Sequence, residues 1–235
     1  MASFAKVSLF GGDHPWSPLD WTSSDDRVRG GSSYSELKCS PFSPTAVFKG
    51  SLDIETLGGA GFASQRTTGE DRSWDLSKYD GILLDTEKAD GKQYTLTLKD
   101  ELLPKSPNGR EQSTVSWEYD FKANQEGEKV YIQWEDMKPT YRGREKKDAK
   151  PLDLKNIKRM SLMMRSFFGT QQGDFSMSIR SISAFHKHAS AHACEPYHDD
   201  PNEASVSRPN EKDGKTLNVK QQSLFGWLFH LCNIS

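Results

Sequence analysis

The sequence has little cysteine, no long apolar run and no excess of charge of one sign. Its three cysteines, Cys39, Cys194 and Cys232, lie far apart and form no CxxC pair. Disulfide frameworks and thiolate metal sites need paired or closely spaced cysteines. We therefore expect neither of them, and we expect the chain to work in a reducing compartment.

No stretch of the sequence is apolar over the length of a membrane span. The longest apolar stretches cover residues 161–168 and 224–232, far short of the roughly 20 residues of a transmembrane helix. The first twelve residues, MASFAKVSLFGG, lack the apolar run of a secretory signal, and Lys6 is the only base before Asp13. We expect no transmembrane span, no secretory signal and no Arg-rich transit peptide.

Basic and acidic residues nearly cancel. The 235 residues include 31 Lys and Arg and 33 Asp and Glu, a formal net charge of −2. This balance gives no electrostatic footprint for a dedicated nucleic-acid binder. Hydrophobic residues make up only 34% of the chain while aromatic residues make up 11%, which disfavours both a membrane protein and a long helical bundle.

The composition changes once, near Phe185. All but four of the aromatic residues precede position 186, and the segment 186–220 has only three large aliphatic residues, too few to bury a core. We expect the final segment, 221–235, to dock on the domain, with membrane-interface contact and a fraying end as alternatives. The predicted parts are an N-terminal extension (1–20), a folded domain (21–185), a polar disordered tail (186–220) and a short apolar segment (221–235).

Within the folded domain, glycine and Asp-Gly clusters separate short runs of β-branched and aromatic residues. The runs alternate between apolar and polar residues, which is typical of strands with one buried face. They predict an all-β fold, an antiparallel two-sheet sandwich of jelly-roll type. Strands in such a fold bury alternate residues, so few but bulky apolar side chains suffice for the core. The predicted strands, about eight, lie at residues 47–55, 61–66, 81–85, 94–98, 115–121, 130–134, 158–168 and 175–182.

Two tryptophans could belong either to the core or to a sugar-binding surface. Trp117 shares its strand face with Tyr119 and Phe121, and Trp134 has the parity of the aliphatic residues at 130 and 132. The alternation favours the core for both.

The sequence contains no recognised catalytic motif. It contains no GxSxG, HExxH or GxxxxGK[ST] motif and no GxGxxG motif that opens a helix. We predict that the chain is not an enzyme and has no catalytic residue and no cofactor. The glycine-rich segment 58–62 resembles a phosphate-binding loop, but a strand-like segment follows it in place of a helix. We interpret it as a hairpin turn.

Two polar clusters carry other chemistry. His186, His188, His192 and His198, with Cys194, match no structural zinc spacing and lie in the predicted tail, so we predict no metal site. The run 142–150 carries five bases against two acids and could meet a phosphate or an acidic partner, although such runs are usually solvated loops. Interleaved aromatic residues are absent, so we expect no nucleic-acid partner.

Seven short motifs follow one another in the folded domain. They are Asp25-Asp26 with Gly30-Gly31-Ser32-Ser33, Phe48-Lys49-Gly50, Gly59-Ala60-Gly61-Phe62-Ala63-Ser64-Gln65-Arg66, Tyr79-Asp80-Gly81, Asp90-Gly91-Lys92-Gln93-Tyr94, Pro139-Thr140-Tyr141-Arg142-Gly143 and Gly173-Asp174-Phe175. Together, over roughly residues 21–185, they resemble the complex I intermediate-associated protein 30 family. Two departures from the family pattern are the basic Arg27-Val28-Arg29 and the extra Ala60 in the second glycine motif.

The resemblance implies a galactose-binding-like jelly roll and a role as a non-catalytic assembly factor or chaperone for mitochondrial respiratory complex I. Its partners would be membrane-arm assembly intermediates and other assembly factors, and peripheral membrane association stays open. The implied location is mitochondrial, with the cytoplasm as the alternative because no presequence is evident. A carbohydrate- or small-ligand-binding jelly-roll module is the alternative function.

From the motifs we also expect particular site residues. Arg66, Tyr141 and Arg142 are candidates for partner or ligand contact, because Arg and Tyr are enriched at interface hot spots. Their structural alternatives are an ion pair at a strand end for Arg66 and loop packing for the other two. We expect positive φ at Gly31, Gly59 and Gly81. The glycines that we expect to shape loops are Gly30, Gly31, Gly59, Gly61, Gly81, Gly91 and Gly143.

Overall fold

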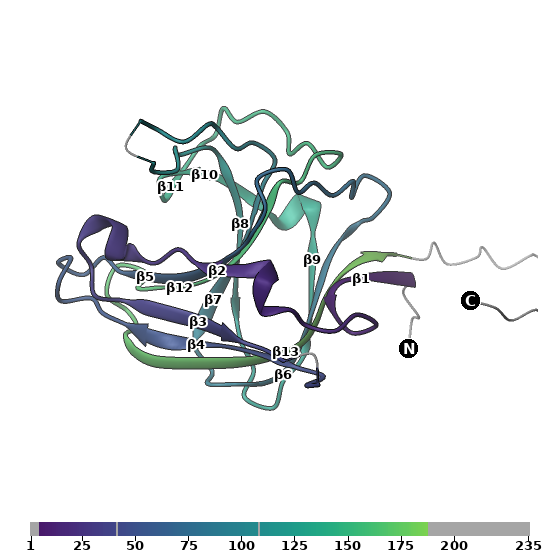
Figure 1. Ribbon diagram of the computed structural model, residues 1–235, viewed down its shortest axis with the longest axis horizontal. Helices are drawn as coiled ribbons and strands as arrows, with labels where there is room; N and C mark the ends of the chain where they lie inside the picture. The colour runs from purple at the N-terminus through teal and green to yellow at the C-terminus, as the bar shows by residue number, and fades with distance from the viewer. Residues whose placement is uncertain (1–4, 41, 108, 188–235) are drawn as a thin grey trace, which may run out of the picture. The chain divides into compact units, whose positions relative to one another are not determined.

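Two antiparallel β-sheets pack face to face in the structure, a computed structural model that describes residues 5–40, 42–107 and 109–187. One sheet has the strand order β3-β4-β13-β6-β9, with β1 also paired to β13 (Figure 1). The other has the order β11-β10-β8-β7-β12-β5-β2. The predicted all-β, two-sheet jelly-roll fold is confirmed.

The strands are β1 (Ala5–Gly11), β2 (Trp21–Ser23), β3 (Tyr34–Lys38), β4 (Ala46–Leu52), β5 (Phe62–Thr67), β6 (Gly81–Ala89), β7 (Gln93–Lys99), β8 (Ser116–Lys122), β9 (Lys129–Gln133), β10 (Lys138–Tyr141), β11 (Arg144–Glu145), β12 (Arg159–Arg165) and β13 (Gly173–His186). Three short 3-10 helices, η1 (Pro18–Asp20), η2 (Asp26–Arg29) and η3 (Trp134–Asp136), complete the elements. Within these described residues, no helix has the length and apolarity to cross a membrane.

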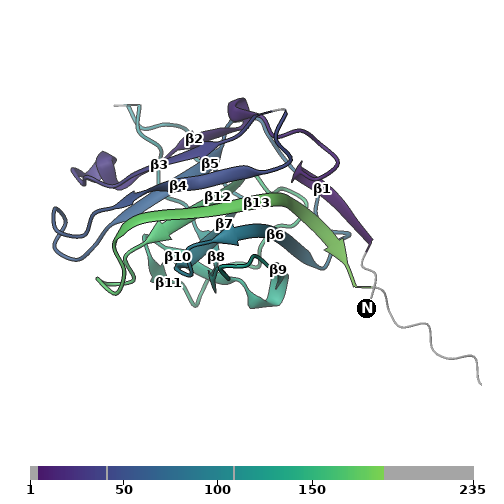
Figure 2. The same cartoon turned by 90° about the horizontal axis from the view of Figure 1, so that it is seen from below.

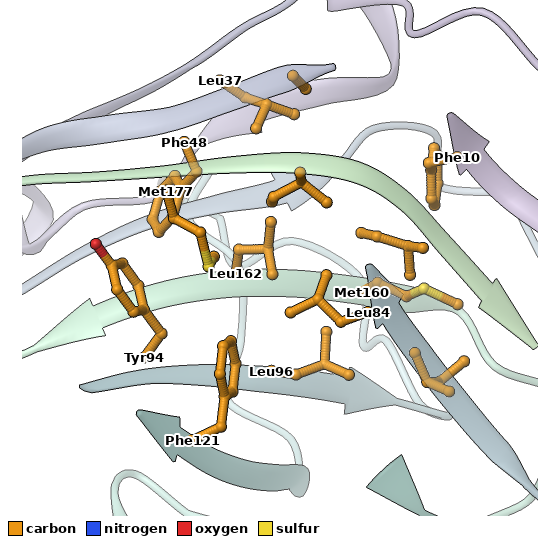
Figure 3. Packing of buried hydrophobic residues seen from close by; sticks show 14 of the residues in the cluster. Phe10, Leu37, Phe48, Leu84, Tyr94, Leu96, Phe121, Met160, Leu162 and Met177 are labelled. Carbon is orange, nitrogen blue, oxygen red and sulfur yellow. The ribbon is translucent and has the colours of Figure 1, made fainter. Parts of the chain in front are cut away.

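The core lies between the two sheets and uses alternate residues of each strand (Figure 3). Tyr94, Leu96 and Leu98 of β7 are fully buried there, and Phe48 and Met177 meet them from the opposite sheet. Rings dominate one end, where Phe48, Tyr94 and Phe175 pack with centroids 5.1–6.2 Å apart. The aromatic-rich, apolar-poor composition is therefore explained by alternate burial of large side chains.

Both ambiguous tryptophans contact the core, as predicted. Trp117, like Tyr119 and Phe121, faces inward from β8, and Trp134 packs against the cluster from η3. The indole Nε1 of Trp134 donates to the Tyr79 carbonyl oxygen at 2.6 Å. Neither indole is free for stacking on a sugar.

Strand β13 organises the six-stranded sheet. Its first half pairs with β4 and its second half with β1, while β6 pairs along the other edge (Figure 2). The register shifts around Arg180, and the Arg180 carbonyl oxygen accepts hydrogen bonds from Gly12 N and from Trp16 Nε1. This bulge anchors the chain that follows β1.

The domain therefore begins earlier than the predicted boundary at residue 21. Residues 5–11 form a strand of the sheet, and Phe10 and Trp16 are buried in the core. The boundary was misplaced because the glycines that follow β1, Gly11 and Gly12, look like the end of an extension. The predicted tail and apolar segment lie outside the described residues from residue 188 onward.

The strands that the prediction missed are β1, β2, β3, β10 and β11. They have two to seven residues, and β2, β3 and β11 lie at ends of the two sheet orders. The strands of two to four residues, β2, β10 and β11, carry too few residues for alternation to stand out. Residues 152–157 form a turn and a single bridge between Ile157 and Trp74.

Candidate functional site

The outer face of the seven-stranded sheet is polar but largely withdrawn from solvent. Strands β7, β8 and β12 turn apolar residues inward and hydroxyl, amide and charged residues outward. Among the outward side chains, Thr97, Glu118 and Arg159 are only 4%, 8% and 5% exposed. Buried polar groups need hydrogen-bond partners. Side chains of this face that the protein already pairs are not available to a ligand.

The segment between β7 and β8 covers part of this face. The Glu111 carboxylate bonds both Arg66 Nη2 and Arg159 Nη1 at 2.8 Å. The ammonium of Lys99 donates to Thr114 Oγ1 at 3.0 Å. These contacts attach the segment to β5, β7 and β12 and leave a groove beside it.

The groove consists of two adjoining pockets of about 250 and 450 Å³. Arg29, Phe62, Arg142 and Arg165 belong to the walls of both pockets, so the two are continuous. Lys99 lines only the smaller pocket, and Phe168 lines only the larger one. The larger pocket alone falls in the range of small-molecule sites, roughly 300–1,000 Å³.

One arginine of the groove is paired with carboxylates. Arg165 Nη1 lies 2.8 Å from Glu118 Oε2, and Arg165 Nη2 bonds both Asp120 oxygens at 2.6 and 2.7 Å. Thr95 Oγ1 donates to Asp120 Oδ1 at 2.6 Å. The two acids of the groove are thus held by a single cation.

The remaining cations of the groove have aromatic or hydroxyl neighbours. The guanidinium of Arg29, at the end of η2, lies 5.4 Å from the centre of the Phe62 ring. Arg142, in the β10–β11 turn at φ 53°, lies 5.4 Å from the centre of the Tyr141 ring. Among the described residues, no ion pair involves Arg29, Lys99 or Arg142.

Two cations of this face sit in surroundings that disfavour their charge. Burial, followed by repulsion from Arg159, lowers the pKa of Lys99 below its usual 10.5. The same two causes, in the same order, lower the pKa of Arg66. Burial is the larger cause at both residues, and attraction by Glu111 offsets it in part.

Two buried carboxylates position the groove wall at η2. Asp26 accepts from Ser33 N at 3.1 Å, Ser33 Oγ at 2.7 Å and Phe62 N at 3.1 Å. Asp25 likewise accepts from Ser35 Oγ at 2.6 Å and from Ser64 N at 2.9 Å. The pair therefore ties η2, with Arg29 at its end, to β5.

Comparison with known proteins assigns a family. Residues 9–179 match the family described as Complex I intermediate-associated protein 30. The chain belongs to this family. It is also 44% identical, over 184 residues, to the uncharacterized protein C9E9.15 of Schizosaccharomyces pombe, an alignment that covers 76% of this chain and 84% of that protein.

A solved structure shares the fold of this family member. The family 11 carbohydrate-binding module of the cellulosomal cellulase Lic26A-Cel5E of Clostridium thermocellum superposes with a TM-score of 0.51 at 15% identity. The superposition covers 77% of this chain and 95% of that module. At this identity the likeness concerns the jelly-roll fold alone.

The three predicted contact residues of this family member have different surroundings. Arg142 lines both pockets, and Tyr141, 39% exposed, lies beneath its guanidinium. Arg66 lies on the same sheet face but is paired with Glu111. The structure thus places Arg142 on the groove wall, with Tyr141 outside the lining and against the Arg142 guanidinium. Arg66 has an ion pair, the structural alternative considered for it.

The predicted positive φ is confirmed at Gly59, at 92°, and is wrong for Gly31 and Gly81. At these two positions glycine is required because a side chain would have no room. A Cβ on Gly31 would lie 2.3 Å from Asp26 Oδ1, and one on Gly81 would lie 2.1 Å from the Ile132 carbonyl oxygen. Gly30, Gly91 and Gly143 do have positive φ, whereas Gly61, like Gly31, is packed closely, with Asp53 O at 2.1 Å from an added Cβ.

The interpretation of residues 58–62 as a hairpin turn is wrong, because β4 and β5, the strands on either side, belong to different sheets. The segment is a turn between the sheets, and the strand β5 follows it in place of a helix. Sequence reasoning missed the cations Arg29, Lys99, Arg159 and Arg165. The basic Arg27-Val28-Arg29 departure from the family pattern was a signal for the first of them, and the polar alternation of β12 was a signal for the last two.

In residues 5–40, 42–107 and 109–187, no group of three His, Cys, Asp or Glu side chains is placed to hold a metal ion. His186 ends β13, with its Nδ1 3.8 Å from Asp80 Oδ2. The other three histidines of the tail cluster and Cys194 lie outside the described residues.

Proposed function

We propose that this chain is a non-catalytic assembly factor of mitochondrial respiratory complex I that binds assembly intermediates. The observation that carries the proposal is family membership across residues 9–179, a range that spans nearly the whole sandwich. Proteins of this family are named for association with complex I intermediates, and the groove offers this chain a binding surface. The absence of any recognised catalytic motif agrees with a binding role.

In this role the sandwich acts as a rigid scaffold that presents loops. The groove walls come from η2, from the β10–β11 turn and from the segment between β12 and β13. Exposed side chains with hot-spot chemistry, Tyr141 and Arg142, stand at its edge. A partner held there would be released when later subunits bury the same surface.

The test is deletion of the gene in the source organism, with complex I assembly measured on native gels and the tagged protein located by fractionation. We expect accumulation of partly assembled complex I, a mitochondrial location and crosslinks to membrane-arm subunits. Re-expression of Arg142→Ala should rescue less well than re-expression of the matched control Arg144→Ala. Normal complex I in the deletion strain, with the protein confined to the cytosol, would overturn the proposal.

A second candidate is a carbohydrate- or small-ligand-binding module. The groove itself favours it, because Phe62 lines both pockets and Tyr141 is exposed beside them. The module of similar fold is a carbohydrate-binding one by name. Binding of the purified chain on a glycan array, lost in Phe62→Ala, would support this function, and an array without signal would exclude it for the glycans displayed.

A further inference from the structure

The groove concentrates positive charge in a chain that is negative overall. The smaller pocket is lined by four cations, Arg29, Lys99, Arg142 and Arg165, and by one carboxylate, Glu118. The formal charge of its wall is therefore +3, whereas that of the whole chain is −2. Such a contrast attracts anions to one place on the molecule.

Of the four cations in the wall of the smaller pocket, Arg165 alone forms ion pairs with carboxylates among the described residues. Glu118 is bonded to Arg165, whose second nitrogen is taken by Asp120. For the other three cations of the wall, the described residues supply no ion-pair partner. Attraction by Glu111 and Glu118 offsets the burial of Lys99 only in part, since its pKa stays lowered, so a bound anion would stabilise the pocket.

Unused hydrogen-bonding atoms gather on the same sheet face. Among the described residues, four buried side-chain atoms have no hydrogen-bond partner, and three of them are Thr97 Oγ1, Arg159 Nε and Arg165 Nε. Thr97 of β7 lies opposite Ser161, the next outward position of β12 after Arg159, whereas Arg165 lies at the far end of β12. Buried polar atoms without partners are rare in native proteins, and of these three residues Arg165 belongs to the groove wall.

We propose that this groove binds a small phosphomonoester, with the phosphoryl group among Arg29, Lys99 and Arg142. A phosphomonoester carries about −1.5 to −2 charge at neutral pH and three strong acceptor oxygens, which matches a compact wall of charge +3. The guanidinium fork suits phosphate oxygens in a bidentate manner. The proposal goes beyond the assembly role and does not depend on it.

The rest of the groove suits the carbon skeleton of such a ligand. Phe62 and Met163 border the cationic pocket, and Phe168 borders the adjoining larger one. The smaller pocket, of about 250 Å³, holds all four cations, and the larger one adds no further cation. An extended acidic peptide would need further cations along the groove, and this difference favours the small ligand.

The experiment is isothermal titration calorimetry of the full chain with four probes. They are inorganic phosphate, glucose 6-phosphate, glucose and a short phosphoserine peptide. We expect glucose 6-phosphate to bind more tightly than inorganic phosphate, and glucose to give no heat at the same concentrations. Rising salt should weaken the binding, because the contacts are ionic.

Variants test the location. Arg29→Ala and Arg142→Ala should each weaken glucose 6-phosphate binding about tenfold, the loss expected for one charge-assisted hydrogen bond. Lys147→Ala and Lys150→Ala, on the same basic run but outside the pocket wall, are the matched controls and should bind as the wild type does. All four positions are exposed, and unchanged unfolding curves would show that the fold is intact.

Three results would overturn the proposal. They are no binding of any phosphorylated probe at millimolar concentration, equal binding of glucose and glucose 6-phosphate, and wild-type affinity in the double variant Arg29→Ala/Arg142→Ala. Tighter binding of the phosphoserine peptide than of glucose 6-phosphate would overturn the small-molecule source. A complex I defect in the deletion strain, without phosphate binding, would leave the assembly role standing and remove only this inference.

Discussion

At the scale of single residues, the buried acids near the start of the domain decide the shape of the groove. Asp26 is fully buried and accepts three hydrogen bonds, two from Ser33 and one from Phe62 N. Its role is structural, since its partners are all protein groups that would otherwise be buried without acceptors. The same bonds hold Phe62 at the groove wall.

Replacement of this carboxylate should destabilise the fold. We expect Asp26→Ala to lower the free energy of unfolding by roughly 3 kcal/mol, because the donors of Ser33 and Phe62 stay buried without partners. Denaturant unfolding followed by circular dichroism measures this. The exposed Asp71 provides the control, since Asp71→Ala should change the free energy by less than about 0.5 kcal/mol. Equal effects of the two substitutions would contradict the structural role.

Lys99 should show the opposite behaviour. We expect Lys99→Met to raise the free energy of unfolding near pH 7 by roughly 1 kcal/mol, because a half-buried cation without a carboxylate partner is removed. The pKa of Lys99 is lowered in the folded state, first by burial and then by Arg159. Between that lowered pKa and the unfolded value of 10.5, the unfolded chain binds more protons, so the stability of the wild type rises with pH there.

The advantage of Lys99→Met over the wild type should therefore shrink as the pH rises toward 10.5. Unfolding titrations of both proteins from pH 7 to the alkaline limit check this. A difference that is constant across the range would show that the charge of Lys99 is not the cause.

At the scale of elements, β1 and the turn after it are part of the domain. Trp16 is 2% exposed, stacks with Phe10 at 6.3 Å and donates to the Arg180 carbonyl oxygen at the bulge of β13. The N-terminal strand thus extends the sheet where β4 ends. Truncated forms that begin at residue 21 would lose these contacts.

We expect Trp16→Ala to cost about 3–5 kcal/mol of unfolding free energy, the usual range for removal of a large buried aromatic side chain. Leu19→Ala, at a position 83% exposed three residues later, is the control and should be nearly neutral. Thermal and denaturant unfolding measure both. A Trp16→Ala variant as stable as Leu19→Ala would place residues 5–20 outside the cooperative unit.

The strand β6 shows why a glycine can be required without positive φ. Gly81 begins β6 opposite Ile132 and Gln133 of β9, and an added Cβ would also lie 2.8 Å from the Phe185 ring. We expect Gly81→Ala to cost about 2–3 kcal/mol, because backbone and a buried ring must move. Gly143→Ala, with φ 75° and open space, should cost about 1 kcal/mol from backbone strain. The reverse order, measured by denaturant unfolding, would contradict this account.

At the scale of the whole molecule, the core residues of the described part of the chain run from Phe10 to Phe185. A chain ended after Lys187 should therefore still unfold cooperatively. Its loss of unfolding free energy relative to the full chain would measure the predicted docking of residues 221–235. Failure of the shortened chain to fold would contradict a self-sufficient domain.

Much of the fold could be predicted because the central strands are long and alternate clearly. The predicted strands at 94–98 and 115–121 correspond to β7 and β8, and Trp117 packs against the core as predicted. The expected solvent-exposed face of 94–98 is wrong, since Thr95 and Thr97 are buried too. The edge strands β2, β3 and β11 were not predicted. They have three, five and two residues, and so few residues hardly show the alternation of apolar and polar side chains. The order of the strands in each sheet could not be predicted, since pairing depends on contacts distant in sequence.

The candidate site was predicted only in part. Arg142 was chosen for its residue type within a motif, and it does line the groove. Arg29, Lys99 and Arg165 come from three separate elements, and nothing local indicates that η2, β7 and β12 bring them to one pocket. Arg66 was chosen by the same reasoning as Arg142, yet a carboxylate 45 positions later, Glu111, pairs with it.

The sequence by itself determined the all-β class, the alternate burial of a few large side chains and the family, because each of these depends on local pattern or on the order of motifs. Only the tertiary structure decided that the first strand belongs to the sheet and that four cations meet with a single carboxylate. The physical reason is that local pattern sets which face of a strand is buried, whereas the balance of charge in a groove depends on which faces and loops the fold brings together.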